Sequence, residues 1–388
     1  MTSSVLYDPL DPATIADPYP IYAQMREQEP VLWHDGMGAW VLTRYEDCRE
    51  VLVNNQVFAR DRRRAGGKIA DRWVQIQTDD PPANASLRGA LRHSISLEHG
   101  EAICQRAAAE VAKQLARLGD GERIEAMSEL AAPASLQITC EVHGVTPPPL
   151  DEYIEIFTGL ALSMDAGLDP SRAQYGISAA SKFTALMAQW FDSAREGGLI
   201  HAAREIGAAH EAPPRYVENT MCATFNASFS TLFVTTGSVL LTLARQPELL
   251  EQLRDESVFR TAIDELVRYS GSAQGSMRWA TEDTILNGMP IRRGDGIVIL
   301  FSAANRDPTE FPNPDRVDLA RRPNRHLAFG WGAHSCSGAN LGQTWVGQLI
   351  KALTVQSPRL QLAESPKYYH LATVRGLERL ALTGASPS

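Results

Sequence analysis

Apolar residues recur every three or four positions through the middle of the chain, and this spacing predicts helices over most of residues 87–245. Turn-rich stretches at 119–122, 145–149 and 211–214 separate the predicted helices. The longest uninterrupted stretch, residues 215–245, would form a helix roughly 46 Å long at ~1.5 Å per residue, long enough to cross a domain and wall a ligand pocket. Polar residues throughout this stretch argue against a membrane span: Asn226, Ser228, Ser230, Thr231, Thr235, Thr236, Ser238 and Thr242.

Strand signals are short and lie towards the two ends of the chain. Residues 30–33 and 39–43 flank a glycine-containing turn and predict a hairpin, after which residues 45–53 return to helical spacing. An Asn-Gly pair within residues 284–291 predicts a second hairpin, and residues 296–300 predict a strand. We find no linker, internal repeat or low-complexity tract. The pattern therefore predicts a mainly α protein with small β regions, folded as a single domain over residues 1–388.

Composition and charge narrow the function classes. A net charge of -9 and a pI near 5.6 give the wrong sign for attraction to nucleic acid or anionic lipid. The first thirty residues are rich in Asp and Pro and contain no signal peptide or anchor pattern, so we expect a cytoplasmic protein with no membrane partner. The odd number of cysteines favours reduced thiols over a disulfide framework: Cys48, Cys104, Cys140, Cys222 and Cys336.

The most informative segment is Phe-Gly-Trp-Gly-Ala-His-Ser-Cys-Ser-Gly at residues 329–338. A cysteine binds a metal as a thiolate, and Cys336 stands just before a predicted helix, where free amides and the helix dipole favour an anion. Phe329 offers an aromatic surface for a flat ring. Three glycines would let the backbone turn sharply or approach a macrocycle closely: Gly330, Gly332 and Gly338.

An isolated cysteine is more often a small buried hydrophobe than a metal ligand. Here, however, the pattern Phe-Gly-x-Gly-x-His-x-Cys-x-Gly resembles the haem-binding signature of the cytochrome P450 family, and the resemblance extends over residues 17–380. It implies a helical triangular prism with small β-sheet regions, and a haem b whose axial ligand is Cys336. No Cys-x-x-Cys-His motif is present to attach the haem covalently.

Glu265 and Arg268 are three residues apart on a predicted helix, a spacing at which a carboxylate and a guanidinium can pair. Exposed pairs of this kind are common and contribute little. By the family resemblance, these two residues join Arg316 in a structural triad beneath the haem, where a third partner offsets the cost of burying the charges.

The two haem propionates require cationic or strong hydrogen-bond donors at the haem edge. By the resemblance, Arg88, Arg278 and His334 occupy positions that hold them, and His326 is a further candidate. Asn84 stands where the family commonly has histidine, so it would bring a donor without a charge. Taken singly, each arginine is more often a surface residue.

In the predicted long helix, the resemblance places Ala227 and Ser228 at a notch beside the oxygen site, Ser230 at the usual acid and Thr231 at the alcohol that aids proton delivery. Serine can relay a proton through water but cannot act as an acid near neutral pH. Ala227 and Thr231 are four apart and would share one face. The alternative is that these are ordinary small residues whose hydroxyls bond back to the helix.

The resemblance implies a monooxygenase or oxidase that activates dioxygen and oxidises a small organic substrate, and we predict a role in specialised-metabolite biosynthesis. Electrons from NAD(P)H would arrive through a ferredoxin reductase and a ferredoxin, for which Arg321, Arg322 and Arg325 form a candidate basic patch. The replaced acid leaves three interpretations open: hydroxylation, oxidative coupling, or a haem-binding sensor or recruitment protein without turnover. The expected pocket segments, 60–77, 227–231, 272–277 and 371–373, mix small, polar and basic residues that fit many substrates.

Overall fold

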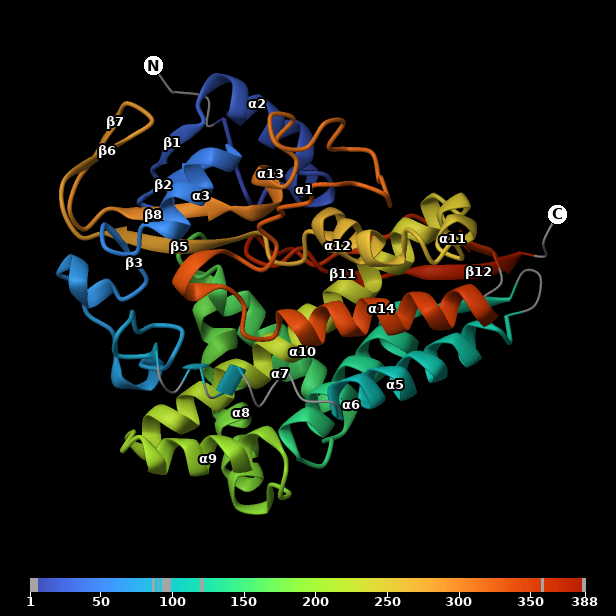
Figure 1. Cartoon of the computed structure of the whole chain (residues 1–388). Coiled ribbons are helices and arrows are strands. Elements are labelled where there is room, and N and C mark those ends of the chain that lie inside the picture. The colour runs from blue at the N-terminus through green and yellow to red at the C-terminus, as the bar shows by residue number, and fades with distance from the viewer. Residues whose placement is uncertain are drawn as a thin grey trace.

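The computed structural model describes residues 6–85, 88–89, 91–92, 99–118, 122–356 and 359–385. The longer elements confirm a mainly α protein with small sheets, as Figure 1 shows. The helices are α1 (Pro12–Ala16), α2 (Tyr19–Gln28), α3 (Tyr45–Val53), α5 (His99–Leu115), α6 (Ala132–His143), α7 (Leu150–Met164), α8 (Ala173–Ser193), α9 (Leu199–Ala209), α10 (Pro214–Arg245), α11 (Glu248–Gln252), α12 (Phe259–Ser270), α13 (Phe301–Ala304) and α14 (Ala339–Gln356). Short helical turns are η1 (Arg62–Ala65), η2 (Asp71–Trp73), η3 (Met127–Ala131), η4 (Pro170–Arg172) and η5 (Gly332–His334).

The largest sheet joins strands from distant parts of the chain in the order β1-β2-β8-β5-β3. Its strands are β1 (Val31–His34), β2 (Ala39–Leu42), β3 (Phe58–Ala59), β5 (Gly275–Ala280) and β8 (Gly296–Leu300). The hairpin β1–β2 and the strand β8 form as predicted, and β2 pairs with β8 in parallel. Because β3 pairs with β5, the residues that follow β3 lie beside the strand that carries Arg278.

The remaining strands form small sheets. A three-stranded sheet runs β4-β12-β9, from β4 (Arg123–Glu125), β9 (Arg359–Leu362) and β12 (Ala381–Ala385). Two hairpins are β6 (Thr284–Leu286) with β7 (Met289–Ile291), and β10 (Lys367–Tyr368) with β11 (Leu377–Arg379). The predicted Asn-Gly turn closes β6–β7, with φ of 48° at Asn287 and 78° at Gly288, the left-handed values that this tight turn requires.

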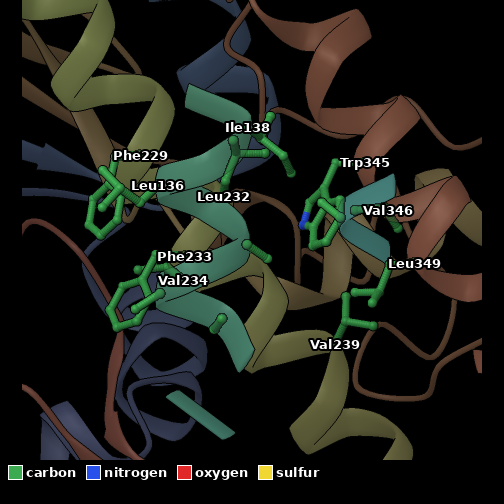
Figure 2. Packing of buried hydrophobic residues seen from close by; sticks show 14 of the residues in the cluster. Leu136, Ile138, Phe229, Leu232, Phe233, Val234, Val239, Trp345, Val346 and Leu349 are labelled. Carbon is green, nitrogen blue, oxygen red and sulfur yellow. The ribbon is translucent and has the colours of Figure 1, made fainter. Parts of the chain in front are cut away.

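Helix α10 is the central element of the core. Most of its residues from Phe225 to Ala244 are buried, because apolar residues and small polar ones surround the helix along most of this part. Figure 2 shows Phe229, Leu232 and Phe233 among side chains from α6 and α14. Contrary to the argument from its polar residues, the length and composition of α10 would suit a membrane span, but 72% of its most apolar window is buried inside the protein, as in a core helix.

Helix α14 is fixed against the core along its length. The Trp345 indole Nε1 donates to Thr236 Oγ1 on α10 at 2.8 Å, and Leu349 lies beside Val239 in Figure 2. Helix α5 runs along its other side in Figure 1. Because α14 begins at Ala339, this packing also fixes the position of the loop that carries Cys336.

Candidate functional site

The loop before α14 is held in one conformation by its own backbone. The Cys336 amide donates to the Phe329 carbonyl at 2.7 Å, so the segment folds back on itself. Gly332 has a φ of +70°, and a Cβ there would lie 2.6 Å from the Leu52 carbonyl oxygen on α3. Gly330, at φ +63°, makes the other sharp turn. Glycine is therefore required at both positions because the backbone is left-handed there, and at Gly332 also because the Leu52 carbonyl lies so close.

The Cys336 side chain is accessible but recessed, since protein surrounds it closely. That burial raises the pKa of its thiol above the usual value, although the Gly338 amide and the charges of Arg88 and Arg92 oppose the shift. The helix start therefore does not by itself make the sulfur a thiolate, which differs from the sequence-based expectation. A bound metal ion would supply the missing positive charge, because a coordinating thiol is deprotonated outright.

Two glycines leave room beside the sulfur and beside the Phe329 ring. A Cβ at Gly338 would lie 3.9 Å from the Cys336 sulfur, and a Cβ at Gly342 would lie 3.4 Å from the Phe329 ring. Among the described residues, no group of three or more His, Cys, Asp or Glu side chains could hold a metal ion. The site thus offers a single thiol beside an aromatic ring, an arrangement that suits a metal carried by a flat macrocycle.

Three of the residues predicted to hold propionates come together beside this loop. Arg88 donates from Nη2 to the Ser335 carbonyl, next to Cys336. His334 Nε2 lies 2.6 Å from Asp80 Oδ1. Arg278 is only 2% exposed, and burial together with the charge of Arg60 lowers the pKa of its guanidinium to about 9.

Asp80 is the carboxylate at the centre of this group. Burial alone would raise its pKa, but hydrogen bonds from His334, from the backbone amides of Asp61 and Arg60, and from Arg64 lower it to about 2. Asp80 is therefore ionised and already engaged. Arg60, Arg88 and Arg278 carry more positive charge than the single carboxylate of Asp80 can balance. A ligand with two carboxylates would neutralise the excess, so these residues fit a haem.

Two of the predicted haem contacts, Asn84 and His326, have other neighbours in the structure. The Asn84 amide donates to the Ile76 carbonyl at 3.1 Å and to the Asp79 carbonyl, so both of its N–H groups are used in holding the preceding loop. His326 lies on the α12 side, where Asp264, Arg268 and Glu265 are its charged neighbours. Burial lowers the pKa of His326 to about 4, and its ring lies 5.7 Å from the Phe329 ring, so it is a neutral side chain packed against the Cys336 loop.

On α10, Ala227 and Thr231 are exposed although the residues around them belong to the buried core. The two exposed residues are four apart, so they lie on one accessible face of α10. The hydroxyls of Thr231 and Ser230 both donate to the Ala227 carbonyl, at 2.8 and 3.3 Å. Both hydroxyl hydrogens are therefore bonded back to the helix, as the alternative interpretation expects. The hydroxyl oxygens still have lone pairs that can accept a hydrogen bond.

The buried triad exists with a different third member. Glu265 and Arg268, both essentially unexposed, pair through Oε2–Nε at 2.8 Å, and the second cation is Arg321, whose Nε lies 3.0 Å from Glu265 Oε2. Arg316 is exposed, and its backbone carbonyl, not its guanidinium, faces Arg268. The prediction of Arg316 is wrong because Arg316 and Arg321 lie five positions apart in one irregular loop, and sequence spacing cannot tell which of them meets Glu265.

This correction also changes the predicted basic patch. Arg321 is buried, and its guanidinium is occupied by Glu265 and by the Pro312 carbonyl at 2.9 Å. Arg322 and Arg325 are exposed. Only these two of the three arginines are available at the surface before the Cys336 loop.

Comparisons with known proteins agree with this geometry. A family model described as cytochrome P450 matches residues 210–365. The chain is 27% identical to the beta-dihydromenaquinone-9 omega-hydroxylase of Mycobacterium tuberculosis, over 96% of this chain and 77% of the relative. It is 28% identical to the mycinamicin IV hydroxylase/epoxidase of Micromonospora griseorubida, over 88% of each chain. Among solved structures, the P450 PksS of the Bacillus subtilis bacillaene polyketide synthase superposes with a TM-score of 0.85 at 25% identity, over 98% of this chain and all of that one.

The fold and the family match define a mainly helical oxidoreductase of the P450 type. The chain belongs to the cytochrome P450 family, and it is an enzyme of the P450 monooxygenase class.

Asp80 is a site residue that sequence reasoning missed, and Arg60 was named only as the start of an expected pocket segment, without a role. Asp80 opens the Asp-Pro-Pro segment that leads to Arg88, so a turn signal was present but its partner, His334, is 254 residues away. Arg60 stands in a run of arginines that suggests solvated surface, and only the pairing of β3 with β5 brings it beside Arg278.

Proposed function

We propose that Cys336 is the axial thiolate ligand of a haem b, and that the protein uses dioxygen to oxidise a small organic substrate. The observation that carries this proposal is the recessed thiol on a glycine-bent loop, with the buried Arg278 nearby, for which the described residues provide no ion-pair carboxylate. When bound, the haem supplies oxygen chemistry that a thiolate ligand promotes by donating electron density.

The loop residues would position this group. Phe329 and the bare backbone at Gly330 and Gly338 would let it lie close to the chain, and Arg88 and Arg278 would hold its propionates. His334 would hold one propionate indirectly or share it, because its Nε2 is already paired with Asp80. Glu265, Arg268 and Arg321 would stabilise the fold under the site without touching the reacting atoms.

Residues of α10 would handle protons and exclude water on the opposite side of the pocket. Thr231 Oγ1 would accept a hydrogen bond from a relay water, since its own hydrogen is donated to Ala227. Ser230, at the position of the usual acid, donates to the same carbonyl and carries no proton that it can release near neutral pH. We therefore propose proton delivery that depends on water or on the substrate, which suits oxidative coupling as well as hydroxylation.

The relatives support a role in specialised metabolism, since one is named for mycinamicin IV and a structural neighbour for a bacillaene polyketide synthase. We propose a substrate from a comparable biosynthetic pathway. The five free cysteines support a cytoplasmic site. Strands from residues 31–59 and 275–300 share one sheet, which supports a single domain.

Electrons would come from NAD(P)H through a reductase and a ferredoxin that docks near the Cys336 loop. Arg322 and Arg325 support this proposal, because exposed cations steer an acidic partner and lose that effect as salt screens them.

Two measurements test the proposal. The reduced protein with carbon monoxide should show a strongly red-shifted Soret peak, and Cys336→Ser should lose it. A normal, unshifted peak in the wild type would contradict the thiolate assignment. Product formation with a surrogate ferredoxin and reductase then separates turnover from a sensor or recruitment role, in which substrate would bind but remain unchanged.

A further inference from the structure

Arg60 follows strand β3 and points into the arginine cluster. Its backbone amide donates to Asp80 Oδ1 at 3.1 Å, and its Nη1 donates to the Ser276 hydroxyl oxygen. Arg278 Nη1 donates to the same oxygen at 2.8 Å. Since both guanidiniums are within hydrogen-bond reach of one atom, their nitrogens lie at most roughly 6 Å apart.

Two like charges are thus held together, one on the buried Arg278 and one on the half-buried Arg60. Burial lowers the pKa of both arginines, and the charge of Arg60 lowers that of Arg278 further. Within the described part of the chain, neither guanidinium forms an ion pair with a carboxylate, and the nearest carboxylate, Asp80, is occupied by His334 and Arg64. A buried cation such as Arg278 is stable only with a partner, and a second like charge beside it adds repulsion, so this arrangement favours a bound anion.

The neighbouring arginines show how unusual Arg60 is. Arg63 pairs with Asp61 and Asp79, and Arg64 pairs with Asp80. Arg62 is exposed, and its guanidinium lies 5.8 Å from the centre of the Trp279 ring. In this run, the Arg60 guanidinium turns inward, and the acceptor it has among the described residues is the Ser276 hydroxyl oxygen.

Ser276 completes the geometry. Because its oxygen accepts from both arginines, its own hydrogen is left to donate to a further acceptor. Ser276 and Arg278 are two apart on β5 and share one face of the strand, which Arg60 approaches from β3. Two guanidinium groups and a hydroxyl therefore converge, and a carboxylate can accept from all three through its two oxygens.

We propose that Arg60, together with Ser276 and Arg278, forms a carboxylate-binding site at the edge of the haem pocket. The inference rests on the proposed function, because the pocket is defined by Cys336. The carboxylate has two possible sources: a haem propionate, which would gain a ligand beyond Arg88 and Arg278, or the acid group of a substrate. Arg60 is a binding residue in either case.

The experiment uses the haem-loaded wild type, Arg60→Met, and Arg62→Met as the matched control. Arg62→Met removes the same charge two residues away, from an exposed side chain outside the cluster. The first measurement is the rate at which haem transfers to apomyoglobin. The second is a spectral titration with palmitic acid and with its methyl ester, which differ only in the carboxylate.

If a propionate is the ligand, Arg60→Met should release haem roughly tenfold faster, as expected for one lost charge-assisted hydrogen bond. If a substrate acid is the ligand, the wild type should prefer the acid over the ester, and Arg60→Met should lose that preference roughly tenfold. Arg62→Met should change neither result. Ser276→Ala, a smaller change, should alter haem release or acid preference in the same direction as Arg60→Met. It replaces Arg60→Met in the test if that variant does not fold.

The proposal is overturned if haem release and acid preference are both unchanged in Arg60→Met and Ser276→Ala while the carbon monoxide complex keeps its red-shifted Soret peak. Absence of that peak in the wild type itself would instead refute the proposed function, so the two failures are distinct.

Discussion

Replacing Arg321 should destabilise the protein far more than replacing Arg316, because only Arg321 takes part in the buried ion network. Arg321 donates to Glu265 Oε2 at 3.0 Å from a side chain that is 6% exposed, and Glu265 is unexposed. Removing one partner of a buried pair costs about 3–5 kcal/mol. Arg268 and the Asp318 amide remain on Glu265 after the change, which favours the lower end of that range.

The assay is thermal and denaturant unfolding of Arg321→Met, with Arg316→Met as the matched control. For a chain of 388 residues, about 0.8 kcal/mol corresponds to one degree, so a loss of about 3 kcal/mol lowers Tm by roughly 4 °C. The exposed Arg316 should change stability by no more than about 0.5 kcal/mol. Equal effects of the two changes, or a larger effect at Arg316, would refute the assignment of the triad.

Glu265→Gln should cost more than Arg321→Met, roughly 4–5 kcal/mol, because it leaves two buried cations without their common partner. His143 is fully buried, and burial lowers its pKa to about 4, so the unfolded chain binds more protons between pH 6.5 and 4 and stability should fall as pH drops through that range. In His143→Phe, the drop in unfolding free energy between pH 7 and pH 4 should be smaller by about 3 kcal/mol, measured by denaturant unfolding at both pH values. An unchanged drop would contradict the role of His143. Reversing both charges at Arg322 and Arg325 should slow reduction by a ferredoxin roughly tenfold at low salt and little at high salt, and equal rates at low salt would contradict the docking surface. Thr231→Ala should increase peroxide release per NAD(P)H consumed, whereas Ser230→Asp should lower it; no change in either variant would place proton delivery elsewhere.

Local patterns in the sequence were enough to predict the elements that depend on neighbours in the chain. The Asn-Gly turn at β6–β7, the hairpin β1–β2 and the helix α10 form where the sequence predicts them, since turn chemistry and apolar spacing are local properties. The glycine-bent loop around Cys336 belongs to the same group, because the left-handed backbone at Gly330 and Gly332 is encoded in the segment itself.

Residues whose partners lie far away in the sequence could not be placed in this way. Arg321 and Arg316 stand in one irregular loop, and only the folded chain shows which of them meets Glu265. Asn84 has the right donor for a propionate, but carbonyls of its own loop take both hydrogens. Arg60 became distinguishable from its exposed neighbours only when the pairing of β3 with β5 brought it to Ser276.

The central claim is a bond between the Cys336 sulfur and the haem iron, and X-ray absorption at the iron edge of the purified ferric protein tests it most directly. We predict one sulfur scatterer in the first coordination shell together with the porphyrin nitrogens, and its replacement by a nitrogen in Cys336→His. A shell of nitrogen and oxygen alone in the wild type would contradict the account.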